Sequence, residues 1–146
     1  MRKTIVSTLF MMVMTLGLVG ANGQDADSIK QLINIAYVEG IHNQGNLNDT
    51  RNGFHPAFQM FVLRNGVVST VSIDQWIQRI EQGRSRNPNT ATERASARYL
   101  SIDIAGEAAS VKLELHRGDQ VLFTDYLLLY RLNGQWKIVS KAYQVH

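Results

Sequence analysis

Asp125 is the residue whose chemistry stands out most clearly in the sequence. It lies between Phe123 and Leu127 in a largely apolar run, the pattern of a strand that is covered on both faces. A buried carboxylate has to be protonated or paired, because removal from water disfavours its charge. Asp125 is therefore either a general base that faces a pocket or half of a structural ion pair, and we favour the ion pair.

The turns on either side of Asp125 predict its neighbours. A two-residue turn at Gly118-Asp119 places Asp125 opposite Lys112 on the preceding strand. A two-residue turn at Asn133-Gly134 places it opposite Ala142 on the following strand. Lys112 is therefore the predicted partner of Asp125, and a single β-bulge would change this assignment locally.

His55 and Tyr37 are the other candidates for proton transfer. His55 lies between Phe54 and Pro56, near the expected mouth of a pocket, where it is either an acid–base group or a hydrogen-bonding cap. The Tyr37 hydroxyl could donate a hydrogen bond to an oxyanion that develops on a substrate. The catalytic candidates are therefore Asp125, His55 and Tyr37.

Neither a metal ion nor a cofactor is expected. The four histidines are scattered, and none has the two-histidine helical spacing of metalloproteases. The sequence contains no cysteine, which excludes thiolate ligands. It also lacks a glycine-rich phosphate loop and a Gly-x-Ser-x-Gly motif.

Several aromatic residues with polar edges could line a pocket for a flat, ring-shaped ligand, although each is individually better suited to a core. They are Tyr37, Trp76, Tyr99, Tyr126 and Tyr143. Trp136 is expected in the core. Lys141 is expected beside Tyr126, where its ammonium group lies in solvent or contacts an anionic ligand. The predicted ligand-binding residues are Tyr37, His55, Trp76, Tyr99, Lys112 and Asp125.

Helices and a hairpin precede a strand-rich last third. Apolar residues at helical spacing follow Ser28, Asn65-Gly66 is a hairpin turn, and Ser72 with Gln75 forms a capping box. The expected elements are a helix from Ser28 that frays after Gly40, a short helix over 48–54, a hairpin over 59–71, a helix over 73–83, a loop over 83–92, and strands over 94–104, 107–116, 120–131 and 135–145. Short turns join these last four strands, so they form an antiparallel meander.

The third meander strand is apolar on both of its faces. The helices can cover only one face of the sheet, so the other requires a partner. A second copy of the chain is the economical choice, and we expect a homodimer that forms through the sheet.

Residues 1–23 have the pattern of a secretory signal. Arg2 and Lys3 precede an apolar run, and Ala21-Asn22-Gly23 supplies the small residues that a signal peptidase recognises, so cleavage is expected before Gln24. Residues 24–146 then form one domain, periplasmic or secreted, with no membrane attachment. Loss of Arg2 and Lys3 brings the net charge of +3 close to neutral, so nucleic-acid binding is not expected.

This order of elements resembles the nuclear transport factor 2-like cone fold, in which helices pack into a strongly curved mixed or antiparallel α+β sheet. Within that superfamily the chain is most similar to the bacterial group named putative lumazine-binding proteins and to the SnoaL-like proteins. The residues that carry the likeness are Tyr37-Val38-Glu39-Gly40, Phe54-His55-Pro56-Ala57, Ile102-Asp103-Ile104 with Gly106, Ala109 to Leu113, Asp125-Tyr126-Leu127 and Gly134-Gln135-Trp136-Lys137-Ile138 with Lys141.

The resemblance implies a fold more firmly than a function. The favoured hypothesis is a binding or accessory domain with an aromatic-lined pocket. The second is a cofactor-free isomerase, dehydratase or cyclase that uses Asp125 or His55 as its acid or base. The third is a structural or protein-interaction dimer whose pocket is filled by its own side chains.

Overall fold

A long helical segment begins the folded part of the chain. The computed structural model describes residues 18–88 and 93–146. Helix α1 spans Leu18–Ile33 and continues without a break into η1, a π-helix over Asn34–His42. The helix therefore begins ten residues before Ser28, the predicted start. Residues 1–17 of the predicted signal lie outside the described residues, and the backbone of residues 18–23 is helical.

Helix α2 (Leu47–Gly53) packs closely against η1. The buried Thr50 hydroxyl donates a hydrogen bond of 2.8 Å to the carbonyl oxygen of Ala36. A Cβ atom added to Gly53 would lie 2.3 Å from the Cβ of Ala36, so only glycine permits this approach. Together these two contacts fix α2 beside the segment that carries Tyr37.

Helix α3 (Ile73–Arg86) has the predicted capping box between Ser72 and Gln75 and ends three residues beyond the predicted Gly83. Near its end, the Arg84 guanidinium donates hydrogen bonds to the carbonyl oxygens of Gly45 and Gly40, at 2.8 and 2.6 Å. These bonds satisfy one carbonyl group in η1 and one in the connection that follows it, and they join α3 to this segment.

The strands form one six-stranded sheet in the order β2-β1-β6-β5-β4-β3. The β1–β6 pair is parallel and every other pair is antiparallel, so the predicted four-stranded meander is confirmed and the hairpin extends it. The strands are β1 (Phe54–Arg64), β2 (Val67–Ser72), β3 (Ala95–Ala105), β4 (Ala108–Arg117), β5 (Gln120–Leu132) and β6 (Gln135–Val145).

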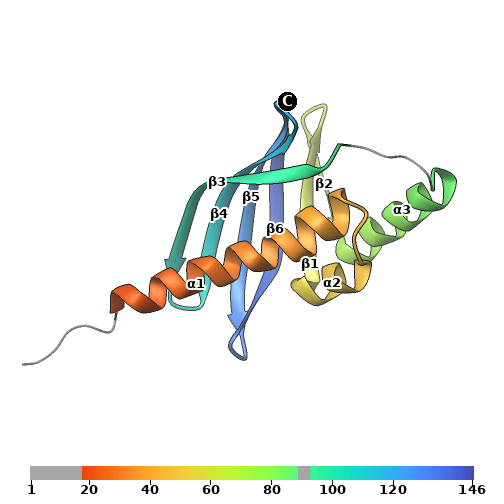
Figure 1. Cartoon of the computed structure of the whole chain (residues 1–146). Coiled ribbons are helices and arrows are strands. Elements are labelled where there is room, and N and C mark those ends of the chain that lie inside the picture. Colours follow the sequence, from red (N-terminus) through yellow and green to blue (C-terminus); the bar gives the residue numbers. More distant parts are fainter. Residues whose placement is uncertain (1–17, 89–92) are drawn as a thin grey trace, which may run out of the picture.

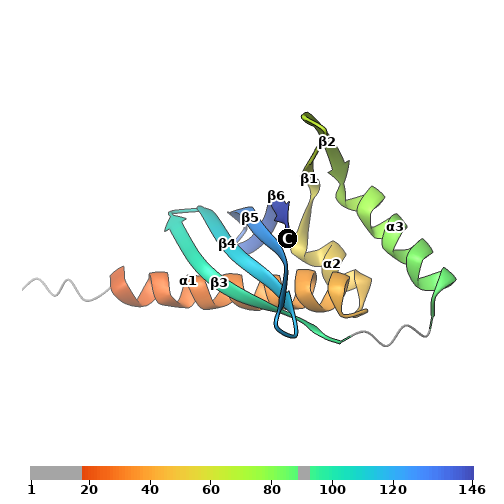
Figure 2. The same cartoon turned by 90° about the horizontal axis from the view of Figure 1, so that it is seen from above.

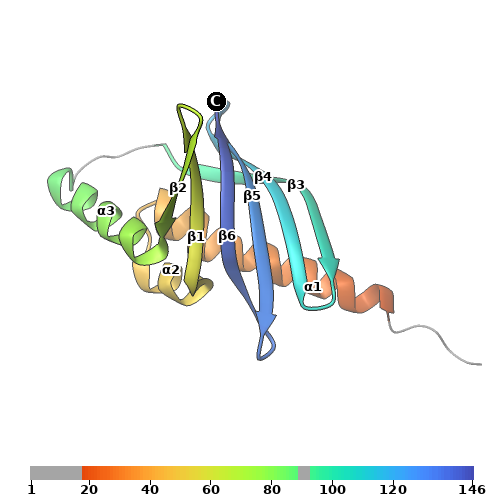
Figure 3. The ribbon, with the colours of Figure 1, turned by 180° about the vertical axis from the view of Figure 1, so that it is seen from behind.

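The sheet is curved and open, and the helices lie on one side of it (Figures 1 and 2). We call the sheet face toward the helices the inner face and the opposite one the outer face. Helix α1 crosses the inner face, and from behind no helix stands in front of β4, β5 and β6 (Figure 3). This architecture confirms the predicted α+β cone.

The two faces of β5 have different surroundings. Asp125, Leu127 and Leu129 are buried in the core, whereas Tyr126, Leu128 and Tyr130 are about half exposed. The strand is thus apolar on both faces, as predicted, and within the described chain only the inner face is covered.

Two β-bulges change the predicted pairing of Asp125. Leu122 is an extra residue in β5 opposite β4, and Val139 is an extra residue in β6 opposite β5. Asp125 therefore lies opposite Leu113 and Tyr143 rather than opposite Lys112 and Ala142. Each bulge shifts the register by one residue, which moves the following side chains to the other face.

Candidate functional site

Three buried polar side chains meet inside the cone. The Tyr37 hydroxyl donates a hydrogen bond of 2.5 Å to Asp125 Oδ2, and Lys141 Nζ lies 2.7 Å from Asp125 Oδ1. Lys141 Nζ also donates a hydrogen bond to the Tyr37 hydroxyl oxygen. Asp125 and Tyr37 are fully buried and Lys141 is 3 % exposed. We call Tyr37, Asp125 and Lys141 the polar cluster.

Each member of the polar cluster comes from a different element. Tyr37 lies in the π-helix η1, whose wider turn is a feature that often accompanies functional sites. Asp125 lies on the inner face of β5. Lys141 reaches the same face of β6 because the bulge at Val139 reverses the direction of its side chain.

Aromatic rings surround the Lys141 ammonium. Its Nζ atom lies 4.4 Å from the centroid of the Tyr37 ring and 5.1 Å from that of Tyr143. The ring centroids of Trp76 and Phe123 are each 5.6 Å away. Trp76, Phe123 and Tyr143 are only partly buried, so the rings above the polar cluster reach toward solvent. Such a cage favours a cation over the ring faces.

His42 adds a neutral, incompletely bonded group to this region. Its ring packs edge-on against the Tyr37 ring, with centroids 4.8 Å apart, and lies 6.1 Å from that of Phe123. The residue is partly exposed, but its Nε2 atom is buried and has no hydrogen-bond partner among the described residues. Asp125 Oδ1 likewise lacks a hydrogen-bond donor in suitable geometry there, although it forms the ion pair with Lys141.

Burial dominates the electrostatics of these residues. Loss of water raises the pKa of Tyr37 well above its usual value, and the Asp125 charge raises it further. Burial lowers the pKa of Lys141, and the attraction of Asp125 opposes this change. Burial lowers the pKa of His42 to about 3, with smaller contributions from the positive charges of Lys141 and Arg117. His42 and Tyr37 are therefore both neutral near pH 7.

The predicted partner of Asp125 is incorrect. Lys112 lies on the outer face opposite Tyr126, and its Nζ atom is 5.4 Å from the centroid of the Tyr126 ring. The predicted position of Lys141, beside Tyr126 in solvent, is also wrong, because Lys141 is the residue that pairs with Asp125. The expectation that Asp125 forms a buried ion pair is correct, but its partner is Lys141 and not Lys112.

The other predicted site residues divide between two locations. Tyr37 belongs to the polar cluster, and the ring of Trp76 lies against that of Tyr37. His55 lies at the start of β1, where its Nδ1 atom accepts a hydrogen bond from the Ala57 amide. The Tyr99 hydroxyl bonds to the Lys30 carbonyl oxygen and the Asn34 side chain. His55 and Tyr99 thus make local or helix-anchoring contacts.

The sequence interpretation missed His42, Phe123 and Lys141 as site residues. His42 looked like the polar end of a helix, whereas the π-helix continues to it and turns its ring onto Tyr37. One consideration could have pointed to Lys141. A buried Asp125 requires a cation from a neighbouring strand, and Lys141 lies on β6, which is the second neighbour of β5.

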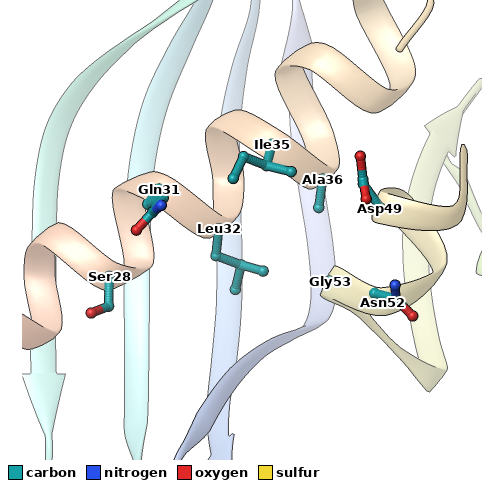
Figure 4. A pocket seen from close by; sticks show the side chains of 8 residues that line it. All are labelled: Ser28, Gln31, Leu32, Ile35, Ala36, Asp49, Asn52 and Gly53. Carbon is teal, nitrogen blue, oxygen red and sulfur yellow. The ribbon is translucent and has the colours of Figure 1, made fainter. Parts of the chain in front are cut away.

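A separate groove lies on the helical side of the molecule, between α1, η1 and α2 (Figure 4). It has a volume of about 290 Å³ and is lined by Ser28, Gln31, Leu32, Ile35, Ala36, Asp49, Asn52 and Gly53. None of these residues belongs to the polar cluster or its aromatic surround. The groove is therefore distinct from the region around Lys141.

Residues 24–144 match the model of a protein family described as "Putative lumazine-binding". The chain belongs to this family. The match begins directly after the predicted signal and ends one residue before the end of β6, so it includes the polar cluster and nearly the whole sheet. No curated protein matches the chain.

Solved structures place this family member in the nuclear transport factor 2-like superfamily. A protein from Shewanella baltica OS155, described as NTF2-like and of unknown function, is 25% identical to this chain, with a TM-score of 0.68. The match covers 85% of this chain and 95% of that protein. An NTF2-like protein of unknown function from Silicibacter pomeroyi DSS-3 is 20% identical, with a TM-score of 0.70, and the match covers 86% of this chain and 98% of that protein. Another from Methylobacillus flagellatus KT is 22% identical, with a TM-score of 0.62, and the match covers 84% of this chain and 93% of that protein. These likenesses confirm the predicted superfamily.

In the described ranges, no three histidine, aspartate or glutamate side chains are grouped as metal ligands would be. No helix there is long and apolar enough to cross a membrane.

Proposed function

We propose that the protein is a small-ligand-binding domain whose ligand stacks on the partly exposed rings of Trp76, Phe123 and Tyr143, above the polar cluster. The observation that carries this proposal is the buried Nε2 atom of His42, which has no hydrogen-bond partner among the described residues and whose ring lies against those of Tyr37 and Phe123. Buried polar groups are nearly always satisfied, so an unsatisfied nitrogen beside partly exposed rings favours a ligand that bonds to it.

The cost of the polar cluster supports a functional role. Well-packed apolar residues often stabilise a core as much as a buried ion pair or more, because two charges must leave water. The strong pKa changes at Tyr37, Lys141 and His42 are typical of sites rather than of ordinary cores. The cluster is therefore better explained by recognition than by stability.

Charge and shape define the ligand class. The charges of Asp125 and Lys141 cancel, and His42 is neutral, so a charged ligand would lose its water without gaining a counter-ion. The partly exposed aromatic rings suit a flat conjugated ring, and His42 Nε2 suits a ring edge that carries a hydrogen-bonding group. Lumazine, named in the family's description, is such a ring, and it is the first compound to test.

Binding can be measured by calorimetry with lumazine and by quenching of Trp76 fluorescence. We expect saturable one-site binding that His42→Phe weakens at least tenfold and that Lys112→Met, on the outer face, leaves unchanged. Native mass spectrometry of the protein from expressing cells should show an added small mass. No binding of lumazine or any co-purified compound, or equal effects of the two variants, would contradict the proposal.

Enzymatic activity is the alternative that the site supports less well. Both Asp125 oxygens already contact Tyr37 or Lys141, so a substrate proton would have to displace one of these groups before transfer. Incubation with a bound compound distinguishes the two functions. A binding domain returns the compound unchanged, whereas an isomerase or dehydratase alters its mass or absorption.

We further propose that the protein is exported and cleaved before Gln24. The charged start, the apolar run and the small residues at 21–23 support this, as does a family match that begins at residue 24. Asp25 would then lie in the first turn of the shortened α1, where an acidic side chain is favourable, held by Arg131 at 2.9 Å. Mass spectrometry of the protein from a periplasmic extract should give a chain beginning at Gln24, and an intact Met1 would contradict export.

A further inference from the structure

We infer that Arg117 is a second hydrogen-bonding residue of the ligand site and selects a ligand whose ring carries a carbonyl oxygen. This inference rests on the proposed function and names the ligand class of the same site. Arg117 is the last residue of β4, and its side chain is partly exposed. Its Nε atom is nevertheless buried and, like His42 Nε2, has no hydrogen-bond partner among the described residues. A buried donor without a partner is rare in proteins, so it indicates a group that binds there.

The alternation of β4 places Arg117 on the inner face, where the ligand site lies. The odd-numbered residues from Ala109 to Leu115 are buried there, and Arg117 continues the series. Its cross-strand partner on β3, Ala95, is buried as well. On the other side of β4, Leu115 pairs with Phe123, whose ring is part of the proposed ligand site. The Arg117 side chain therefore extends from the inner face, two residues beyond the partner of Phe123.

Two hydrogen bonds bring His42 to the same end of β4. The side chain of Asn43, the residue after His42, accepts a hydrogen bond of 2.7 Å from the Ala95 amide and donates one of 2.9 Å to the Ala95 carbonyl oxygen. Ala95 is the residue that pairs with Arg117. Beyond burial and Lys141, the positive charge of Arg117 helps to lower the pKa of His42, so the two side chains are close. The two unsatisfied nitrogen atoms therefore belong to one end of the ligand site.

The chemistry of these two nitrogen atoms restricts the ligand. The Nε atom of an arginine always carries a proton and accepts nothing, so it can only donate a hydrogen bond. A nitrogen of a neutral histidine either donates or accepts. A ring edge with a carbonyl oxygen beside a ring nitrogen, as in a lactam or an imide, satisfies both atoms at once. The carbonyl oxygen accepts from Arg117 Nε, and the ring nitrogen bonds to His42 Nε2.

Charge favours a neutral carbonyl group over an anion at this position. Glu93 lies against Gly118, the residue after Arg117, because a Cβ atom added to Gly118 would be 2.8 Å from both Glu93 carboxylate oxygens. This carboxylate would repel an anion that Arg117 held. Arg117 is partly exposed, so its own charge keeps part of its water and needs no counter-ion from the ligand. The ligand class is therefore a neutral conjugated ring with a lactam or imide edge.

Calorimetry with lumazine and pteridine tests the inference. Lumazine carries ring carbonyl groups beside ring nitrogens, and pteridine is the same ring system without carbonyl groups. We expect the wild type to bind lumazine about tenfold more tightly than pteridine, the effect of one hydrogen bond to a charged group. Arg117→Met should weaken lumazine binding by about the same factor and leave pteridine binding nearly unchanged.

Arg131→Met is the matched control for Arg117→Met. Arg131 forms an ion pair with Asp25 and lies over the Trp136 ring, away from the ligand site, so its loss should leave both affinities unchanged. Urea unfolding without ligand separates binding from structure. Arg131→Met should lower the unfolding midpoint, whereas Arg117→Met should not, because Arg117 Nε has no partner to lose.

The possible failures can be told apart. A folded Arg117→Met variant that binds lumazine as tightly as the wild type would overturn the inference and leave the proposed function intact. An equal loss for lumazine and pteridine would do the same, because it would assign Arg117 to packing against the ring. If the wild type binds neither compound and retains no co-purified compound, the proposed function fails, and the inference with it.

A co-purified compound decides the inference in the same way. Its identification by mass spectrometry should give a ring with a carbonyl group, and Arg117→Met should retain less of it than Arg131→Met. A ring without a carbonyl group, or an anion that Arg117→Met releases, would overturn the ligand class.

Discussion

Lys141 Nζ lies 2.7 Å from Asp125 Oδ1, and both side chains are removed from water. The two residues are on neighbouring strands and share the inner face with the core. A buried pair of this kind makes each partner depend on the other, because either charge alone would be buried without compensation.

Lys141→Met should therefore destabilise the protein strongly, by about 3–5 kcal/mol, because it leaves the Asp125 carboxylate unpaired in the core. Lys112→Met is the matched control and should cost less than about 1 kcal/mol, since Lys112 contacts only the half-exposed Tyr126 ring. Urea unfolding measures both. Equal losses would mean that the ion pair is not the one described.

The double variant separates the pair from its packing. Asp125→Leu added to Lys141→Met removes both charges, so it should recover at least about 2 kcal/mol of the loss seen in Lys141→Met alone. A double variant less stable than either single one would show that the aliphatic and ring contacts of Lys141, rather than its charge, hold the region together.

Much of the fold could be predicted because local signals and global structure agree. The Asn65-Gly66 and Asn133-Gly134 turns both have the positive φ angles that their residue types favour, and Ser72 forms its predicted cap. The bounds of the four meander strands differ from the prediction by at most one residue, whereas β1 begins at Phe54, five residues before the predicted start of the hairpin. Each of these features is encoded within a few consecutive residues.

The site was harder to predict because its geometry depends on the two bulges. Nothing local distinguishes Leu122 or Val139 from their neighbours, since a bulge arises where strand pairing and curvature of the whole sheet have to agree. Each bulge reverses the faces beyond it, so Lys112 and Lys141 exchanged roles. The existence of a buried, paired carboxylate was predictable, and the identity of its partner was not.

Insertion of one alanine after Ser140 tests the role of the register directly. Val139 is already the extra residue of the β5–β6 bulge, so a further residue shifts the pairing beyond it by one and should turn Lys141 and Tyr143 toward the outer face. We expect a loss of more than about 3 kcal/mol, with loss of the near-ultraviolet circular dichroism of the aromatic cage. Val139→Ala keeps the residue count and should cost no more than about 1.5 kcal/mol. An insertion variant as stable as Val139→Ala would contradict this account.

Two glycines in helices should respond in opposite ways to alanine. Gly53→Ala would bring a Cβ within 2.3 Å of the Ala36 Cβ, so α2 must move away from η1 at a cost of about 2 kcal/mol or more. Gly83 in α3 has no atom within 4 Å of an added Cβ, so Gly83→Ala should stabilise the protein by about 0.5–1 kcal/mol. Thermal unfolding of the two variants checks both the packing of α2 and the length of α3.

His42 should make the protein sensitive to acid. Its pKa is about 3 in the folded state because of burial, and the unfolded chain has the ordinary value of about 6.5. The unfolded state therefore binds a proton that the folded state does not, and stability falls as the pH drops from about 6.5 toward 3. At pH 5 the loss is about 2 kcal/mol relative to pH 7.5.

His42→Phe keeps a ring against Tyr37 and Phe123 but cannot be protonated, so its stability should change about 2 kcal/mol less between pH 7.5 and pH 5 than that of the wild type. His55→Phe is the matched control, because His55 lies apart from the polar cluster, and it should follow the wild-type pH dependence. Urea unfolding at the two pH values makes the comparison. If His42→Phe retained the full wild-type loss at pH 5, the acid sensitivity would belong to another group and His42 would not be a buried neutral residue of the site.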